Sequence, residues 1–105
     1  MKDKRYEKLA NNLLTFSVDI KRGDNLLVEI LGEEAIPLAK EIIKKAEELG
    51  ARPQFNIINY EILRVMLENA DEEQIKMYAK HDEASSKASE TNGKKPKRIL
   101  FEWAD

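Results

Sequence analysis

The stretch "NLLVEILGEEAIPLAKEIIKKAEELGARPQFNIIN", residues 25–59, decides the fold. It begins with an apolar run, residues 26–31, that only Glu29 interrupts, which is typical of a strand covered on both faces. Residues 33–49 then show helical spacing, with glutamates in the first turn, lysines near the end and a glycine after it. Residues 51–59 indicate a second strand. Strand, helix and strand in this order predict a βαβ unit.

The flanking segments complete a small α/β domain. Residues 3–18 have the spacing of an amphipathic helix, and a polar turn leads from them to the first strand. Residues 60–70 and 70–84 indicate two further helices, and "RILFEWAD", residues 98–105, alternates like a strand. The order α-β-α-β-α-α-β predicts one three-layer domain over residues 1–105, with helices on a mostly parallel sheet of about three strands.

The composition changes between the last predicted helix and the last predicted strand. "DEASSKASETNGKKPKR", residues 82–98, contains no large apolar residue. Asn92-Gly93 and Pro96 are turn signals. The segment can begin as an extension of the preceding helix, and residues 85–97 are predicted to form a linker within the domain, flexible or engineered.

The overall composition excludes several classes of protein. The 105 residues carry a net charge of −2 and only one short basic cluster, Lys94 to Arg98, so no nucleic-acid partner is predicted. No apolar run approaches the roughly 20 residues of a membrane helix, and the first residues lack the apolar core of a signal peptide. Cysteine is absent, which excludes disulfides and thiolate metal sites. We therefore expect a cytoplasmic protein without a membrane partner.

The turn Leu31-Gly32-Glu33-Glu34 lies where many α/β proteins hold a phosphate. It lacks the further glycines of a dinucleotide fingerprint and the Lys-Ser/Thr pair of a P-loop. Its two glutamates would occupy the positive end of the helix and repel a phosphate. An acidic helix start is therefore favoured over an anion site. Gly32 and Glu33 are retained only as candidates at a ligand-binding edge.

Glu29 is the third candidate at this edge, because it interrupts an otherwise apolar strand. One interpretation directs it into a cleft near the carboxyl ends of the strands, where open α/β sheets bind ligands. The favoured interpretation places it at a strand end or edge, pointing at water. The single histidine, His81, is expected to be exposed on a helix. No catalytic residue, metal ligand or cofactor-binding residue is assigned.

Three phrases and their order resemble a known family. Arg22-Gly23-Asp24, Leu49-Gly50-Ala51-Arg52-Pro53 and Ala70-Asp71-Glu72-Glu73-Gln74-Ile75 follow the pattern of the N-terminal domain of the thermophilic metallo-aminopeptidases, the S and T type leucyl aminopeptidases. The resemblance covers residues 6–84. It implies a parent protein that uses two divalent metal ions to remove N-terminal residues from peptides. The family's metal ligands lie in a C-terminal part that this chain lacks, so the resemblance assigns no ligand here.

The resemblance also has a gap. "SSKASETNGKKPKR", residues 85–98, replaces a middle segment that the family continues with another strand. "RILFEWAD" then resembles a later strand of the same domain. The chain is therefore expected to be a truncated form of that domain, with a polar linker in place of the missing segment.

These observations lead to three functional expectations. The first is a non-catalytic N-terminal domain, inactive alone, with a peptide substrate only in a full-length parent. The alternative is an engineered or excised minimal α/β scaffold without activity. The lowest-ranked is a small-ligand or nucleotide binder at the strand-to-helix edge. A homodimer is expected through exposed apolar surface near Phe101 and Trp103, since such patches promote association.

Overall fold

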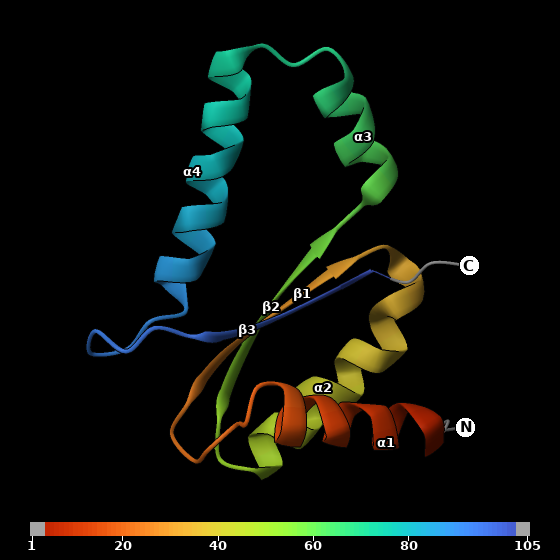
Figure 1. The fold of residues 1–105 in the computed structure, drawn as a ribbon, viewed down its shortest axis with the longest axis vertical. Coiled ribbons are helices and arrows are strands. Elements are labelled where there is room, and N and C mark those ends of the chain that lie inside the picture. The colour runs from red at the N-terminus through yellow and green to blue at the C-terminus, as the bar shows by residue number, and fades with distance from the viewer. Residues whose placement is uncertain (1–3, 103–105) are drawn as a thin grey trace.

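The computed structural model describes residues 4–102 and confirms the α/β class and the predicted order of elements (Figure 1). The elements are α1 (Lys4–Asn12), a π-helical turn (Leu13–Ser17), β1 (Asn25–Leu31), a 3₁₀ turn (Glu33–Ala35), α2 (Ile36–Glu48), β2 (Arg52–Ile58), α3 (Tyr60–Glu68), α4 (Glu72–Ala88) and β3 (Lys97–Glu102). Trp103, which belongs to the last predicted strand, lies outside the described residues.

The sheet has three strands in the order β2-β1-β3, and both pairs are parallel. Val28 in β1 is in register with Phe55 in β2 and with Ile99 in β3. Side chains in register on neighbouring strands point to the same face. We call the face that carries Leu26, Val28 and Ile30 the core face, because these three side chains belong to the buried cluster.

Helices α1 and α2 pack against each other and, with the core face of β1, enclose the hydrophobic core. Leu14, Leu26 and Ile42 are completely buried there. Burying a side chain of this size contributes about 1.5–3 kcal/mol. Helix α2 ends as predicted, because Gly50 adopts a φ of +88°, which a residue with a side chain rarely does. The core therefore depends on residues 4–51 and on β3.

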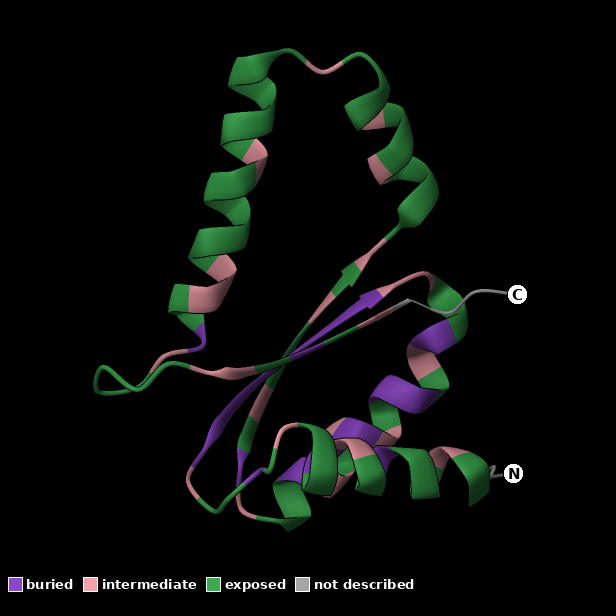
Figure 2. Cartoon of the chain, viewed as in Figure 1, coloured by how far each residue is buried: buried purple, intermediate pink, exposed green. Residues whose placement is uncertain are grey.

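Helices α3 and α4 form a second region, the α3–α4 arm, which projects beyond the end of the sheet (Figure 1). Each begins at a side-chain cap: Asn59 accepts the N–H of Ile62 at 3.0 Å, and Asp71 accepts that of Gln74 at 2.8 Å. Neither helix contains a buried residue (Figure 2). The radius of gyration is 15.0 Å, whereas a compact domain of this length has about 13 Å.

The segment predicted as a linker, residues 85–97, begins as a helical extension and is then held by hydrogen bonds. Residues 85–88 continue α4, and Lys97 begins β3. Ser89 is the C-cap of α4, and its hydroxyl donates to the Ser85 carbonyl at 3.1 Å, which satisfies one of the last carbonyls of the helix. A turn then pairs Thr91 with Lys94.

Candidate functional site

A cavity of about 350 Å³ lies at the carboxyl ends of β1 and β2. We call it the carboxyl-end cavity. Its lining residues are Leu31, Gly32, Glu33, Glu34, Asn59, Tyr60 and Glu61. Two of the three predicted edge residues, Gly32 and Glu33, therefore lie at a cavity in the expected place, and Glu29 does not.

The carboxyl-end cavity is unsuited to an anion. Gly32 has a φ of +103°, and a Cβ on it would lie 2.8 Å from Glu34 Oε2, so the Glu34 carboxylate folds back over the turn. Glu33 and Glu61 add two more carboxylates to the lining, and these repel a phosphate. Within residues 4–102, no group of three or more His, Cys, Asp or Glu side chains converges closely enough to hold a metal ion.

Glu29 corrects both interpretations made from the sequence, because it neither lines a cleft nor points at water. It lies in the middle of the central strand, and the residue is 4% exposed. Arg98 Nε donates to Glu29 Oε1 at 3.0 Å, and Arg98 Nη2 donates to the same oxygen. Both side chains lie on the face opposite the core face, because Arg98 is in register with Leu27.

Arg98 also links the sheet to the α3–α4 arm. Its Nη2 also donates to Asp82 Oδ1 on α4 at 3.0 Å. The hydrogen bonds to Glu29 and then Asp82 raise the pKa of Arg98 above its ordinary value. The three side chains tie the central strand, β3 and α4 together. They form a structural ion-pair chain whose carboxylates are already engaged.

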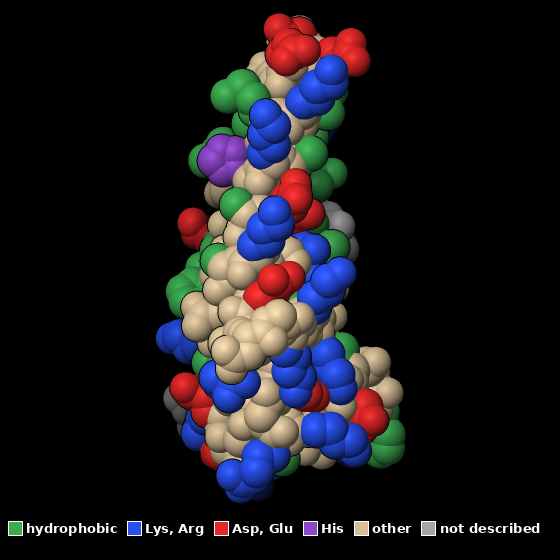
Figure 3. All heavy atoms as spheres, turned by 90° about the vertical axis from the view of Figure 1, so that its left-hand side faces the viewer, with side chains coloured by type: hydrophobic (Ala, Val, Ile, Leu, Met, Phe, Trp, Pro, Cys, Tyr) green, Lys and Arg blue, Asp and Glu red, His purple; other side chains and the backbone are tan. Residues whose placement is uncertain are grey.

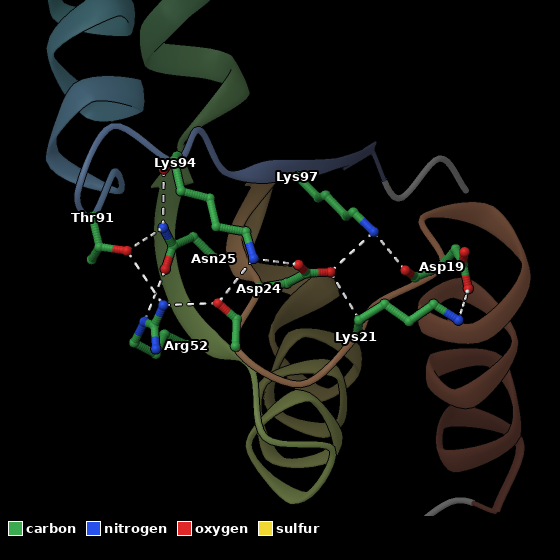
Figure 4. Close-up of polar contacts among 9 residues, drawn as sticks. Asp19, Lys21, Asp24, Asn25, Arg52, Thr91, Lys94 and Lys97 are labelled. Carbon is green, nitrogen blue, oxygen red and sulfur yellow. Dashed lines mark hydrogen bonds and ion pairs between the residues drawn. The ribbon is translucent and has the colours of Figure 1, made fainter.

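A second polar cluster, which we call the amino-end cluster, lies at the amino ends of the strands (Figure 4). Asp24 is almost buried and accepts from Lys94 Nζ at 2.9 Å, Lys97 Nζ at 3.0 Å and the Lys21 N–H at 2.8 Å. The Lys94 hydrogen bond, followed by that of the Lys21 backbone, holds the pKa of the Asp24 carboxyl well below its usual range.

Asn25 extends the amino-end cluster to β2 and to the turn before β3. Its Oδ1 accepts from Arg52 Nε at 3.0 Å, and its Nδ2 donates to Thr91 Oγ1 at 2.9 Å and to the Lys94 carbonyl at 3.1 Å. Arg52 Nη2 also donates to the Gly23 carbonyl at 2.8 Å. These bonds clamp segments far apart in sequence. The sequence signal is a polar residue opening an apolar strand, but its partners are visible only in the structure.

A second cavity, about 250 Å³, is an apolar groove between α2 and β2 on the core face. Its lining residues are Val28, Ile30, Ile36, Ala39, Lys40, Ile43, Phe55 and Ile57. Phe55 is 58% exposed and Ile57 is 47% exposed. The sequence predicted strand β2 but not the groove, because the residues that line the groove come from three separate elements, β1, α2 and β2.

The α3–α4 arm also exposes apolar side chains, among them Ile62, Val65 and Met77. Figure 3 shows basic and acidic side chains interspersed down one side of the molecule, with hydrophobic ones between them. His81 is exposed on α4, as expected. Phe101 is half-buried and packs against the core, and Trp103 is outside the described residues, so the dimer surface predicted there stays a prediction.

Comparison of the chain with models of known protein families found no match, and comparison with curated proteins found no significant match. In the part of the chain that the structure describes, no helix has both the length and the apolar character needed to cross a membrane.

Proposed function

We propose that this chain is a non-catalytic α/β assembly module of a metallo-aminopeptidase-like protein. The observation that carries the proposal is apolar surface left open on both regions of the molecule. The large side chains concerned include Phe55, Ile57, Ile62, Val65, Leu67, Ile75 and Met77. Exposed apolar patches mark interaction sites in soluble proteins. In the family that the sequence resembles, the N-terminal domain contributes to assembly and shapes access to the metal site.

The buried acidic groups support a structural role. Asp24 and Glu29 are the acids buried among the described residues, and each is held by cationic side chains from β3 or the turn before it. Neither lines the carboxyl-end cavity. A catalytic carboxylate needs to reach substrate, whereas these two are occupied in holding strands together.

The open apolar surface also favours assembly over the alternative of a self-contained engineered scaffold, which would bury such side chains. The carboxylates around Gly32 disfavour a nucleotide ligand. In this proposal the two divalent metal ions and the peptide substrate belong to a catalytic region outside this chain. The lack of cysteine is consistent with a cytoplasmic location.

Two measurements test the proposed function. The purified 105-residue protein should not hydrolyse a leucine anilide with added Co²⁺ or Zn²⁺, and metal-dependent turnover would show that the chain is itself an enzyme. The second measurement mixes the chain with the catalytic region of a metallo-aminopeptidase lacking its own N-terminal domain. Sedimentation velocity should show a complex. Absence of any association, with that region or with itself, would contradict an assembly role.

A further inference from the structure

Strand β2 has an open backbone edge. The N–H of Arg52 donates to the Asp24 carbonyl at 2.8 Å, and the Ile58 carbonyl accepts from Gly32 at 2.9 Å, so both residues point their backbone groups toward β1. Backbone groups alternate in direction along a strand. The backbone groups of Pro53, Phe55 and Ile57 therefore face outward, on the side of β2 where the described sheet has no further strand.

Beside this edge lies the apolar groove. Phe55 and Ile57 are in register with Val28 and Ile30, and all four side chains lie on the core face. Val28 and Ile30 are 0% and 2% exposed, whereas Phe55 and Ile57 are 58% and 47% exposed. The helical layer therefore buries these two side chains of β1 and leaves those of β2 about half exposed. The other outer strand differs, because Ile99 is only 6% exposed and Phe101 packs on the core.

The two ends of β2 differ in charge. Arg52 stands exposed at its amino end. Glu33, Glu34 and Glu61 gather around its carboxyl end. Seven residues span roughly 23 Å in an extended strand. Two copies of β2 placed side by side in opposite directions bring the basic end of each next to the acidic end of the other. A parallel arrangement would bring like charges together, which disfavours association.

We infer that two copies of this chain associate through β2, strand against strand in opposite directions, so that Phe55 and Ile57 of each cover the apolar groove of the other. The inference rests on the proposed assembly role and names a second copy as the partner. The twofold axis lies at Phe55. The Phe55 N–H groups and carbonyls of the two copies bond reciprocally, and each Ile57 N–H donates to the Pro53 carbonyl of the other copy.

This register also accommodates the lack of a backbone N–H at Pro53. Pro53 has no N–H to offer at an edge, so its carbonyl accepts a bond and one carbonyl of the other copy, that of Ile57, is left to water at the rim. The result is a continuous antiparallel junction between two parallel sheets. The hydrophobic contribution comes from Phe55, at the centre of the junction, where a truncation has its largest effect.

The first test measures the oligomeric state of the full chain by sedimentation equilibrium over a range of concentrations. We expect a monomer–dimer equilibrium. Phe55→Lys, which places two like charges across the axis, should weaken the dimer by about tenfold or more. Leu100→Lys is the matched control, because Leu100 is 63% exposed on the opposite face of β3, and it should leave the dimer unchanged.

The second test uses the absence of cysteine. Phe55→Cys should form a disulfide-linked dimer on mild oxidation. The Cα atoms of directly opposite residues in a hydrogen-bonded antiparallel pair lie about 5.5 Å apart, which is within the range of Cα–Cα distances found in disulfides. Leu100→Cys should not. A monomer at every concentration, or cross-linking at position 100 instead of 55, would overturn the inference. A monomer that still binds the aminopeptidase catalytic region would leave the proposed function standing.

Discussion

The two outer strands, β2 and β3, flank the same residue of the central strand, but their side chains there differ in exposure to solvent. Ile99 in β3 and Phe55 in β2 are both in register with Val28. Ile99 is 6% exposed and Phe55 is 58% exposed. Both are large apolar residues on the core face, so residue type does not explain the difference. Coverage by the helical layer does, because the buried cluster includes β3 and leaves the outer side of β2 open.

This difference predicts that truncating Ile99 lowers the free energy of unfolding more than truncating Phe55. Ile99→Ala should lower the free energy of unfolding by about 2–4 kcal/mol, because it removes packed atoms and leaves a cavity. Phe55→Ala should cost under about 1 kcal/mol in the monomer, because water already reaches more than half of the ring. Urea denaturation of dilute protein measures both. Equal costs would mean that the groove is already filled within one chain.

The opposite face of β3 gives the next largest effect. Arg98→Met should cost about 2–3 kcal/mol, because it leaves the Glu29 carboxylate buried without a partner. Combining it with Glu29→Leu should recover most of the loss, since an apolar pair can replace a buried ion pair. The same denaturation assay compares the single and double variants. A double variant as unstable as Arg98→Met would indicate that Glu29 has a role besides this pair.

The amino-end cluster predicts a pH dependence. Lys94 and the Lys21 backbone lower the pKa of Asp24 in the folded protein below its ordinary value of 3.8. Its stabilising contribution is therefore fully present well above that value and decreases as the pH falls through it toward the lowered folded pKa. Asp24→Asn should make the unfolding free energy less sensitive to pH below about 5 and cost about 1 kcal/mol or less at pH 7. Thermal melts from pH 3 to pH 7 test this, and an unchanged slope in the variant would contradict it.

The smallest effect is expected on the α3–α4 arm. Val65 is 69% exposed, so Val65→Lys should change the unfolding free energy by less than about 0.5 kcal/mol. The variant should weaken binding to an aminopeptidase catalytic region if the arm takes part in assembly. A large loss of stability without a partner would show instead that the arm folds back onto the sheet in solution.

Much of the fold follows from local patterns. The apolar run of β1, the stripe of α2 and the stop at Gly50 predicted the βαβ unit, and the structure confirms it. The sequence left open how far α4 continues, because Ser and Ala residues permit either a helix or a loop, and in the structure the helix extends to Ala88. At the candidate site, Gly32 and Glu33 line the carboxyl-end cavity and Glu29 does not, and whether this edge binds a ligand stays a prediction.

Glu29 shows why sequence reasoning ends where it does. A charged residue inside an apolar run indicates that a partner for the charge is needed. That partner, Arg98, lies 69 positions away in the sequence. Pairing at that separation depends on β3 lying beside β1, which no local pattern specifies. The exposure of Phe55 is equally non-local, because it depends on how far the helical layer extends over the sheet.

The sequence by itself determined the elements, their order and the parallel βαβ unit, because spacing, capping and turn residues act over a few positions. The tertiary structure alone decided the strand order, the Glu29–Arg98 pair and which apolar surfaces remain open. Burial and ion pairing depend on neighbours brought together by the whole chain, and that is why the proposed assembly role rests on open apolar surface rather than on any motif.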